Sequence, residues 1–147
     1  MRFISSLAAI LPSRIAYAHC DVPCGIYDGK PAQIAAATVL KMVEKIEALP
    51  KDENKWTVTD RANFVRYVLT KEEHGRKCKE ELLVLWTDYF KPEHLEQFPD
   101  LHTKFWQTAK LCSKAKQEVS RESADALVKA VNEIADIFQQ TKAGHSH

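Results

Sequence analysis

The sequence predicts an all-α fold, a four-helix bundle that follows an irregular N-terminal segment. Only four Gly and six Pro occur in 147 residues, so few positions favour tight turns. Apolar residues make up 45% of the chain, and along most of it they recur every three or four positions. This spacing is typical of helices that bury one face, and the length is that of one domain.

The first two helices are expected over residues 31–49 and 59–90, and the second of them is long. Residues 31–49 carry the first pattern, where Pro31 suits the start of a helix and Pro50 ends it. Residues 59–90 carry the second pattern, in which Gly75 is expected to loosen the middle of the helix.

Two further helices complete the predicted bundle of residues 31–147. One or two helical turns are expected between Pro92 and Pro99. The third and fourth helices follow from two apolar series with helical spacing, which are Leu101, Phe105, Ala109 and Cys112, and Leu127, Val131, Ile134 and Phe138. Cys78 and Cys112 fall within helical patterns and are expected to be buried thiols.

Net charge and the length of apolar runs indicate which kinds of binding partner are expected. The net charge is +1, and without residues 1–18 it becomes −1, because 21 − 2 = 19 basic residues then face 20 acidic ones. Nucleic-acid binding is therefore not expected. No segment approaches the ~18 unbroken apolar residues of a spanning helix, so a membrane protein is not expected either.

Residues 1–18 are interpreted as a removable leader. They combine an early Arg2, an apolar run over 3–11 and the small-residue sequence Ala16-Tyr17-Ala18. This outline is typical of a secretory signal, although Pro12 and Arg14 interrupt it. The alternative is an N-terminal amphipathic helix that stays in place.

Residues 19–30 form the segment we call the hook, which lacks apolar periodicity. His19, Cys20 and Cys24 place one imidazole and two thiols within six positions. Sulfur and nitrogen ligands suit copper, zinc, nickel or iron rather than magnesium or calcium. A structural zinc site needs four side-chain ligands, and no second pair of ligands stands out.

Cleavage after Ala18 would add a further ligand. His19 would then carry a free α-amine with a pKa near ~7.7 to 8. This amine, the amide nitrogen of Cys20 and the thiolates of Cys20 and Cys24 could surround an ion in one plane, with the His19 imidazole as an axial ligand. Planar nitrogen and sulfur coordination favours nickel(II) or copper(II). Gly25 would permit an unusual backbone turn directly after Cys24.

Two blocks of sequence resemble the nickel superoxide dismutases. They are HCDVPCGIYD, which starts at His19, and LWTDYFKPEHLEQFPDLH, from Leu85 to His102. The resemblance implies conversion of superoxide to dioxygen and hydrogen peroxide by one nickel ion per subunit, which cycles between the +2 and +3 states. It assigns the metal ligands to His19, Cys20 and Cys24.

The same resemblance implies a catalytic role for Asp21, Tyr27 and Tyr89. Asp21 and Tyr27 match the first block and Tyr89 falls within the second. The tyrosines are expected beside the open face of the metal, where they would order water or exclude larger anions. The alternative is ordinary packing with a satisfied hydroxyl group.

Two positions depart from the family pattern. Ala35 stands where family members carry an acidic side chain that steadies the axial imidazole. His74 stands where they carry an arginine that reaches in from a neighbouring subunit. His74 either serves in place of that arginine or lies at the surface, and the partner of the His19 imidazole stays open.

The resemblance also implies a homohexamer, a leader-cleaving protease and a cytoplasmic location, with export as the alternative if the leader acts as a signal peptide. Three other functions compete. The chain could be a thiol redox protein with a Cys20–Cys24 disulfide, a non-enzymatic nickel or copper carrier, or a bundle that binds other proteins. The specific first block and its position at a processing site favour the enzyme.

Overall fold

A computed structural model describes residues 25–144, and these form helices without any strand. The all-α prediction is therefore confirmed. In chain order the elements are α1 (Lys30–Glu47), a 3-10 turn η1 (Glu53–Lys55), α2 (Val58–Val84), a π-helical turn η2 (Leu85–Tyr89), α3 (Pro92–Gln97), α4 (Leu101–Gln117) and α5 (Arg121–Gly144). No helix among these residues is long and apolar enough to cross a membrane.

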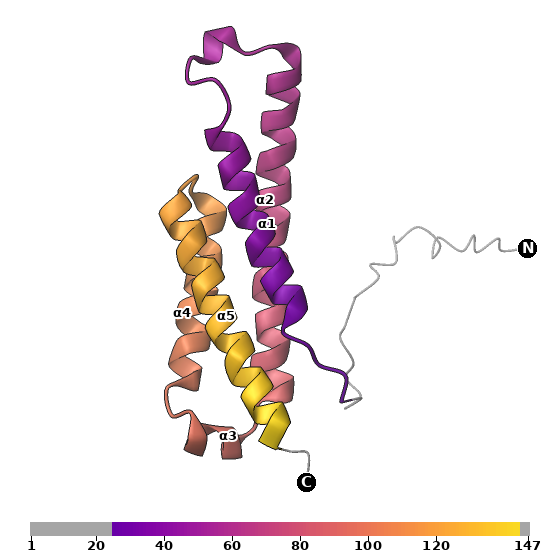
Figure 1. Cartoon of the computed structure of the whole chain (residues 1–147), viewed down its shortest axis with the longest axis vertical. Helices are drawn as coiled ribbons and strands as arrows, with labels where there is room; N and C mark the ends of the chain where they lie inside the picture. Colours follow the sequence, from indigo (N-terminus) through magenta and orange to yellow (C-terminus); the bar gives the residue numbers. More distant parts are fainter. Residues whose placement is uncertain (1–24, 145–147) are drawn as a thin grey trace, which may run out of the picture.

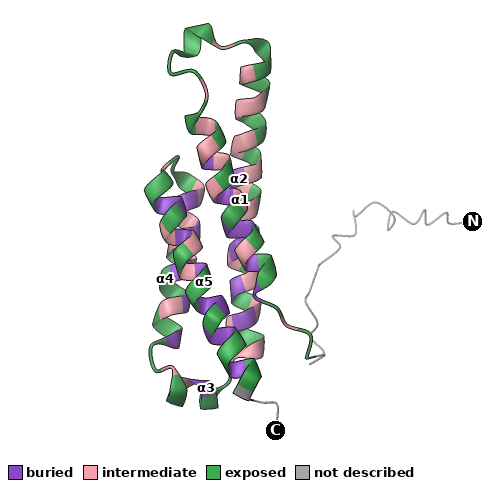
Figure 2. Cartoon of the chain, viewed as in Figure 1, coloured by how far each residue is buried: buried purple, intermediate pink, exposed green. Residues whose placement is uncertain are grey.

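Four helices make up the bundle, as predicted. Helices α2 and α5 both contact α1, and both also contact α4, so the four helices surround one core, across which α1 and α4 make a smaller contact (Figure 1). The hairpin of α1 and α2 extends beyond α4 and α5 at one end, and the short α3 lies at the other end. Buried residues gather where the four helices overlap, whereas the protruding end of the hairpin is mostly exposed (Figure 2).

The core contains most of the predicted apolar positions. Its largest fully buried apolar side chains are Phe105, Phe138, Leu82, Leu101, Leu127 and Ile134. Burial of each such side chain stabilises the fold by about 1.5 to 3 kcal/mol. Cys78 and Cys112 are buried free thiols, as expected.

The apolar patterns over residues 31–49 and 59–90 include Ile34, Val65 and Leu69 and predict their burial, but these three residues are exposed. The face that α1 buries consists of small residues, Ala32, Ala35, Ala36, Val39 and Val43. Ile34 lies on the other side of the helix and is 56% exposed. Val65 and Leu69 on α2 are also more than half exposed, whereas the neighbouring Phe64 and Val68 are half-buried.

Helix α2 differs from its prediction in where it is irregular. It runs unbroken through Gly75, and a Cβ atom there would lie 3.2 Å from Cβ of Lys116 on α4. The glycine therefore allows close approach of two helices rather than loosening one. The irregularity lies at η2, where the Phe90 amide donates to the Leu85 carbonyl five residues earlier, at 3.0 Å.

One charged residue lies inside the bundle rather than on a solvated face. Lys71 on α2 is 2% exposed, and its ammonium donates to the carbonyl oxygens of Ala115, Lys116 and Glu118. These carbonyls lie at the end of α4, where the helix supplies no amide partners. Lys71 therefore caps α4 from the neighbouring helix.

Candidate metal centre

The predicted ligands lie outside the described residues. His19, Cys20, Asp21 and Cys24 all precede Gly25, as does the proposed leader. Within residues 25–144 no group of three or more His, Cys, Asp or Glu side chains could hold a metal ion. The structure therefore describes the base of the hook and the surface next to it.

The described part of the hook begins with a residue in the left-handed backbone conformation. Gly25 has a φ of 70°, a conformation that residues with a Cβ rarely adopt. Gly25 therefore has the unusual backbone conformation that only a glycine adopts readily. Asp28 then accepts a hydrogen bond from the amide of Lys30 at 2.9 Å, which satisfies one of the free amides at the start of α1.

Helix α5 holds the base of the hook at two points. Gly29 is buried against α5, where a Cβ atom would lie 3.2 Å from Cβ of Ala135. The Lys142 ammonium donates to the carbonyl oxygen of Tyr27 at 3.1 Å. The chain that leaves the predicted ligands is thus attached to the C-terminal turns of α5.

The structure brings two of the predicted catalytic residues together. The rings of Tyr27 and Tyr89 have centroids 5.5 Å apart and planes tilted by 59°. Tyr27 comes from the hook and Tyr89 from the last position of η2, and both are half-buried. The π-helical turn therefore ends at the residue that faces the hook.

Aromatic side chains fix the ring of Tyr89. Phe138 of α5 contacts it edge-on, with centroids 4.6 Å apart, and Phe90 does so at 5.0 Å. His94 of α3 stacks on it with planes 11° apart and centroids at 5.7 Å. The Tyr89 hydroxyl lies 2.9 Å from Oγ1 of Thr141.

Sequence reasoning missed His94, Thr141 and Lys142, which surround the tyrosine pair. His94 is buried, and its Nδ1 accepts from the Lys91 amide at 3.0 Å, so the ring proton is on Nε2 when the imidazole is neutral. A signal existed for Thr141, because the series 127, 131, 134, 138 continues to 141. A polar residue at a buried helical position calls for a hydrogen-bond partner.

The two positions that depart from the family pattern do not join the tyrosine pair. Ala35 is 4% exposed and belongs to the core. His74 is half-buried on α2, and its Nδ1 donates to the Thr70 carbonyl at 2.9 Å. It precedes Tyr89 by fifteen residues, roughly 20 Å along the helix.

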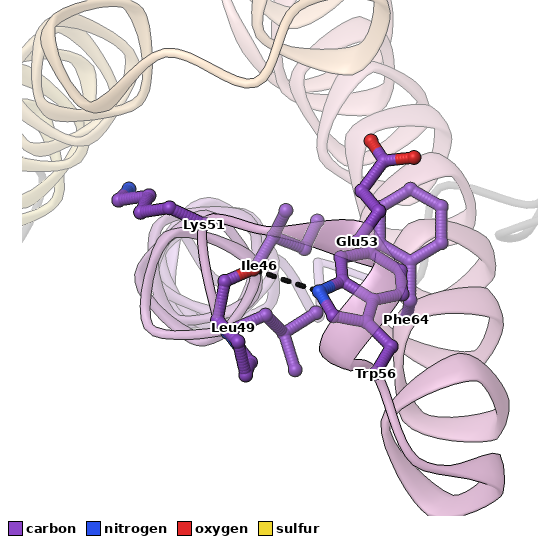
Figure 3. A pocket seen from close by; sticks show the side chains of 7 residues that line it. Ile46, Leu49, Lys51, Glu53, Trp56 and Phe64 are labelled. Carbon is purple, nitrogen blue, oxygen red and sulfur yellow. Dashed lines mark hydrogen bonds between the residues drawn. The ribbon is translucent and has the colours of Figure 1, made fainter.

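A pocket at the turn between α1 and α2 is a separate feature (Figure 3). Its lining is mainly apolar and has no His or Cys, comprising Ile46, Leu49, Pro50, Lys51, Glu53, Trp56 and Phe64. The Trp56 indole donates to the Pro50 carbonyl at 2.7 Å and thereby closes the turn. This pocket lies at the opposite end of α1 from Tyr27 and has no side chain suited to nickel.

Comparisons with known proteins identify the family of this chain. The sequence model of the family described as nickel-containing superoxide dismutase matches residues 14–142. The superoxide dismutase [Ni] of Streptomyces seoulensis is 36% identical over 126 residues, which cover 85% of this chain and 88% of the relative. The enzyme of the same name from Streptomyces coelicolor is 35% identical with the same coverage.

Solved structures show the same fold. A crystal structure of a nickel-containing superoxide dismutase, with nickel ligation corresponding to the oxidized state, superimposes with a TM-score of 0.74 at 35% identity. The match covers 85% of this chain and 99% of that one. The chain therefore belongs to the family of nickel-containing superoxide dismutases, and is a superoxide dismutase with nickel as its cofactor.

Proposed function

We propose that this chain converts superoxide to dioxygen and hydrogen peroxide through a Ni(II)/Ni(III) cycle at the hook, after cleavage behind Ala18. His19 would provide its terminal amine and imidazole, Cys20 its amide nitrogen and thiolate, and Cys24 its thiolate. Family membership and the contact between Tyr27 and Tyr89 next to the hook support this assignment.

The chemistry of the donor set fits nickel. Thiolates and an anionic amide donate electron density strongly, and nitrogen with sulfur suits nickel better than it suits hard cations. Bound nickel would supply the redox chemistry, taking one electron from a superoxide and returning it to another, while the residues named above would hold the ion. No cluster within residues 25–144 offers a competing site with three such ligands.

The chain's own residues would control access to that centre. The rings of Tyr27 and Tyr89 would form a wall that admits small anions and excludes larger ones, with ordered water at their hydroxyl groups. Asp21, next to the ligand Cys20, would belong to the same site. Lys142 and Lys91 are exposed near this wall, and their charges would attract the superoxide anion.

Assembly and maturation complete the proposal. A protease would remove residues 1–18, and the mature chains would form a cytoplasmic homohexamer, with export as the alternative for the location. Val65 and Leu69 expose apolar side chains on α2, which supports contact with another subunit there. His74, distant from Tyr89 within one chain, could then approach the site of a neighbour.

The terminal amine gives the sharpest test. Two proteins are compared, one that begins at His19 and one with a single alanine inserted before His19. We expect about one nickel per chain and rapid superoxide consumption for the first, and loss of activity for the second. Full activity of the extended protein would refute the amine as a ligand. Nickel binding without turnover in both would indicate a metal carrier.

A second variant separates the enzyme from a thiol redox protein. Cys24→Ser removes one of the two proposed thiolate ligands, so we expect it to lose nickel and activity together. If Cys20 and Cys24 form only a disulfide, the nickel content would not depend on this substitution. Intact mass and metal analysis of the same native sample would also show whether the chain begins at His19.

A further inference from the structure

Thr141 connects the Tyr89 hydroxyl to the backbone of α5. Its Oγ1 lies 2.9 Å from Oη of Tyr89, and it donates to the Phe138 carbonyl at 2.8 Å. A hydroxyl group has one proton, and a carbonyl oxygen can only accept. Once the Thr141 proton is directed at Phe138, the Thr141 oxygen can only accept from Tyr89.

We infer that Thr141 is a positioning residue that fixes the direction of the Tyr89 O–H bond. The phenol proton then points into α5, and the oxygen lone pairs are left for groups that approach from the hook. This inference rests on the proposed function only in placing Tyr89 beside the nickel. The hydrogen-bond direction itself is a property of residues 89, 138 and 141.

Burial makes this arrangement rigid. Thr141 is 2% exposed, and Phe138, Phe90 and His94 hold the Tyr89 ring by edge-on contact and stacking. If the Tyr89 proton turned away, the Thr141 oxygen would lose this buried hydrogen bond. Loss of one costs about 0.5 to 1.5 kcal/mol.

The direction of this proton decides what Tyr89 can do. Superoxide only accepts hydrogen bonds, whereas water and hydrogen peroxide also donate them. A phenol whose proton is directed at Thr141 accepts from water or from the peroxide product, and does not donate to superoxide. The protons consumed in forming peroxide would therefore come from a group other than Tyr89.

Spectroscopy tests the inference without nickel. Ultraviolet resonance Raman spectra of metal-free protein, with Tyr89→Phe subtracted, isolate the Tyr89 doublet, whose intensity ratio reports whether a phenol donates or accepts. We expect the donor signature in the native chain and in Thr141→Ser, and its loss in Thr141→Val. A non-donor signature in the native chain would overturn the inference, even if Thr141→Val failed to fold.

Thr108→Val is a matched control. Thr108 is equally buried on α4, and its hydroxyl donates to the Lys104 carbonyl at 2.7 Å. It makes the same kind of bond within its own helix without a tyrosine partner. We expect the Tyr89 doublet to be unchanged in this variant, and a change there would show that any buried threonine produces the effect.

Turnover of the nickel-loaded enzyme provides a second, separate readout. We expect Thr141→Val to lower the second-order rate about two- to tenfold, the range of one lost hydrogen bond. Thr141→Ser should restore most of it. In a Tyr89→Phe background Thr141→Val should have no further effect, and an equal loss there would contradict action through Tyr89. An inactive native enzyme would refute the proposed function, while the Raman result would still decide this inference.

Discussion

The ammonium group of Lys142 donates a hydrogen bond to the backbone carbonyl oxygen of Tyr27, with 3.1 Å between Nζ and O. The same Nζ lies 5.0 Å from the centroid of the Phe138 ring, a cation–π contact. Thr141, the preceding residue, contacts Tyr89. The last turn of α5 therefore contacts both tyrosines of the proposed site, one through its backbone and the other through its hydroxyl.

Replacement of Lys142 should loosen the hook more than it destabilises the fold. Lys142→Met removes the bond to Tyr27 and an exposed cation–π contact worth about 0.5 to 1 kcal/mol. We expect the free energy of unfolding to fall by no more than about 1 kcal/mol, and nickel to be lost faster to a chelator. Denaturant unfolding and the rate of nickel release measure the two effects.

Lys110→Met is the control for this prediction. Lys110 also lies over an aromatic ring, that of Trp106 on α4, at 5.5 Å, and makes no hydrogen bond to residues 25–30, the described part of the hook. The Lys110→Met variant should lower the free energy of unfolding by a similarly small amount and leave the rate of nickel release unchanged. Equal release rates for both variants would show that Lys142 does not hold the hook.

The buried Lys71 should be one of the most sensitive charged positions in the bundle. Lys71→Met keeps the length of the side chain but leaves three carbonyl oxygens at the end of α4 without their donor. We expect a loss of about 2 to 4 kcal/mol in the free energy of unfolding. Activity per bound nickel should be unchanged, because Lys71 lies eighteen residues before Tyr89, roughly 25 Å along the helix.

Lys77→Met provides the comparison on the same helix. Lys77 is exposed and pairs with Glu73 at 2.7 Å, an ion pair in contact with solvent. Its replacement should change stability by less than about 0.5 kcal/mol. If the two variants lost a similar amount of unfolding free energy, the buried hydrogen bonds of Lys71 would contribute no more to stability than the exposed ion pair of Lys77.

Much of the fold could be predicted from apolar spacing. The third helix begins at Leu101 as expected, and the first begins at Lys30 rather than 31. The buried face of α1 could be predicted only in part. Val39 and Val43 follow the apolar spacing and are buried, but the rest of the face is alanine and the larger Ile34 faces outward. Hydrophobicity alone favours the larger residue, whereas close helix packing favours the smaller one.

Of the proposed site, too, only a part could be predicted from the sequence. Local spacing predicts ligands in the hook, because His19, Cys20 and Cys24 fall within six positions, and since these residues lie outside the described part of the chain this stays a prediction. The contact between Tyr27 and Tyr89 joins residues 62 positions apart and depends on how α5 and η2 are placed. The role of Thr141 depends on a hydrogen-bond direction, which no spacing in the sequence encodes.

Thiol labelling should separate the two pairs of cysteines. The chain has four, of which Cys78 and Cys112 are buried. We expect a small thiol reagent to modify Cys20 and Cys24 rapidly in nickel-free protein, and neither of them when nickel is bound. All four should react after unfolding. Rapid labelling of Cys78 or Cys112 in the folded chain would contradict their burial.

The Cys78 thiol should make stability depend on alkaline pH. A hydrogen bond with the Cys112 side chain, together with burial, raises the pKa of Cys78. In the unfolded chain this thiol ionises near pH ~8.5, so above that pH the unfolded state binds fewer protons than the native state. The contribution of Cys78 to the free energy of unfolding should therefore be constant below this pH and fall above it, by at most ~1.4 kcal/mol per pH unit.

Comparison with Cys78→Ala isolates this effect. Both proteins carry Cys112→Ala, because the hydrogen bond with Cys78 lowers the pKa of the Cys112 thiol and this contribution would change with Cys78. Burial still raises the pKa of Cys78 in that background, and the contributions of the remaining groups, including Cys20 and Cys24, largely cancel in the difference between the two stabilities. We expect the protein that keeps Cys78 to be the more stable at pH 7, because its replacement leaves a cavity. The difference should shrink as the pH rises from about 8.5 towards 10. A difference that stays constant over this range would mean that the buried thiol loses its proton as readily as an exposed one.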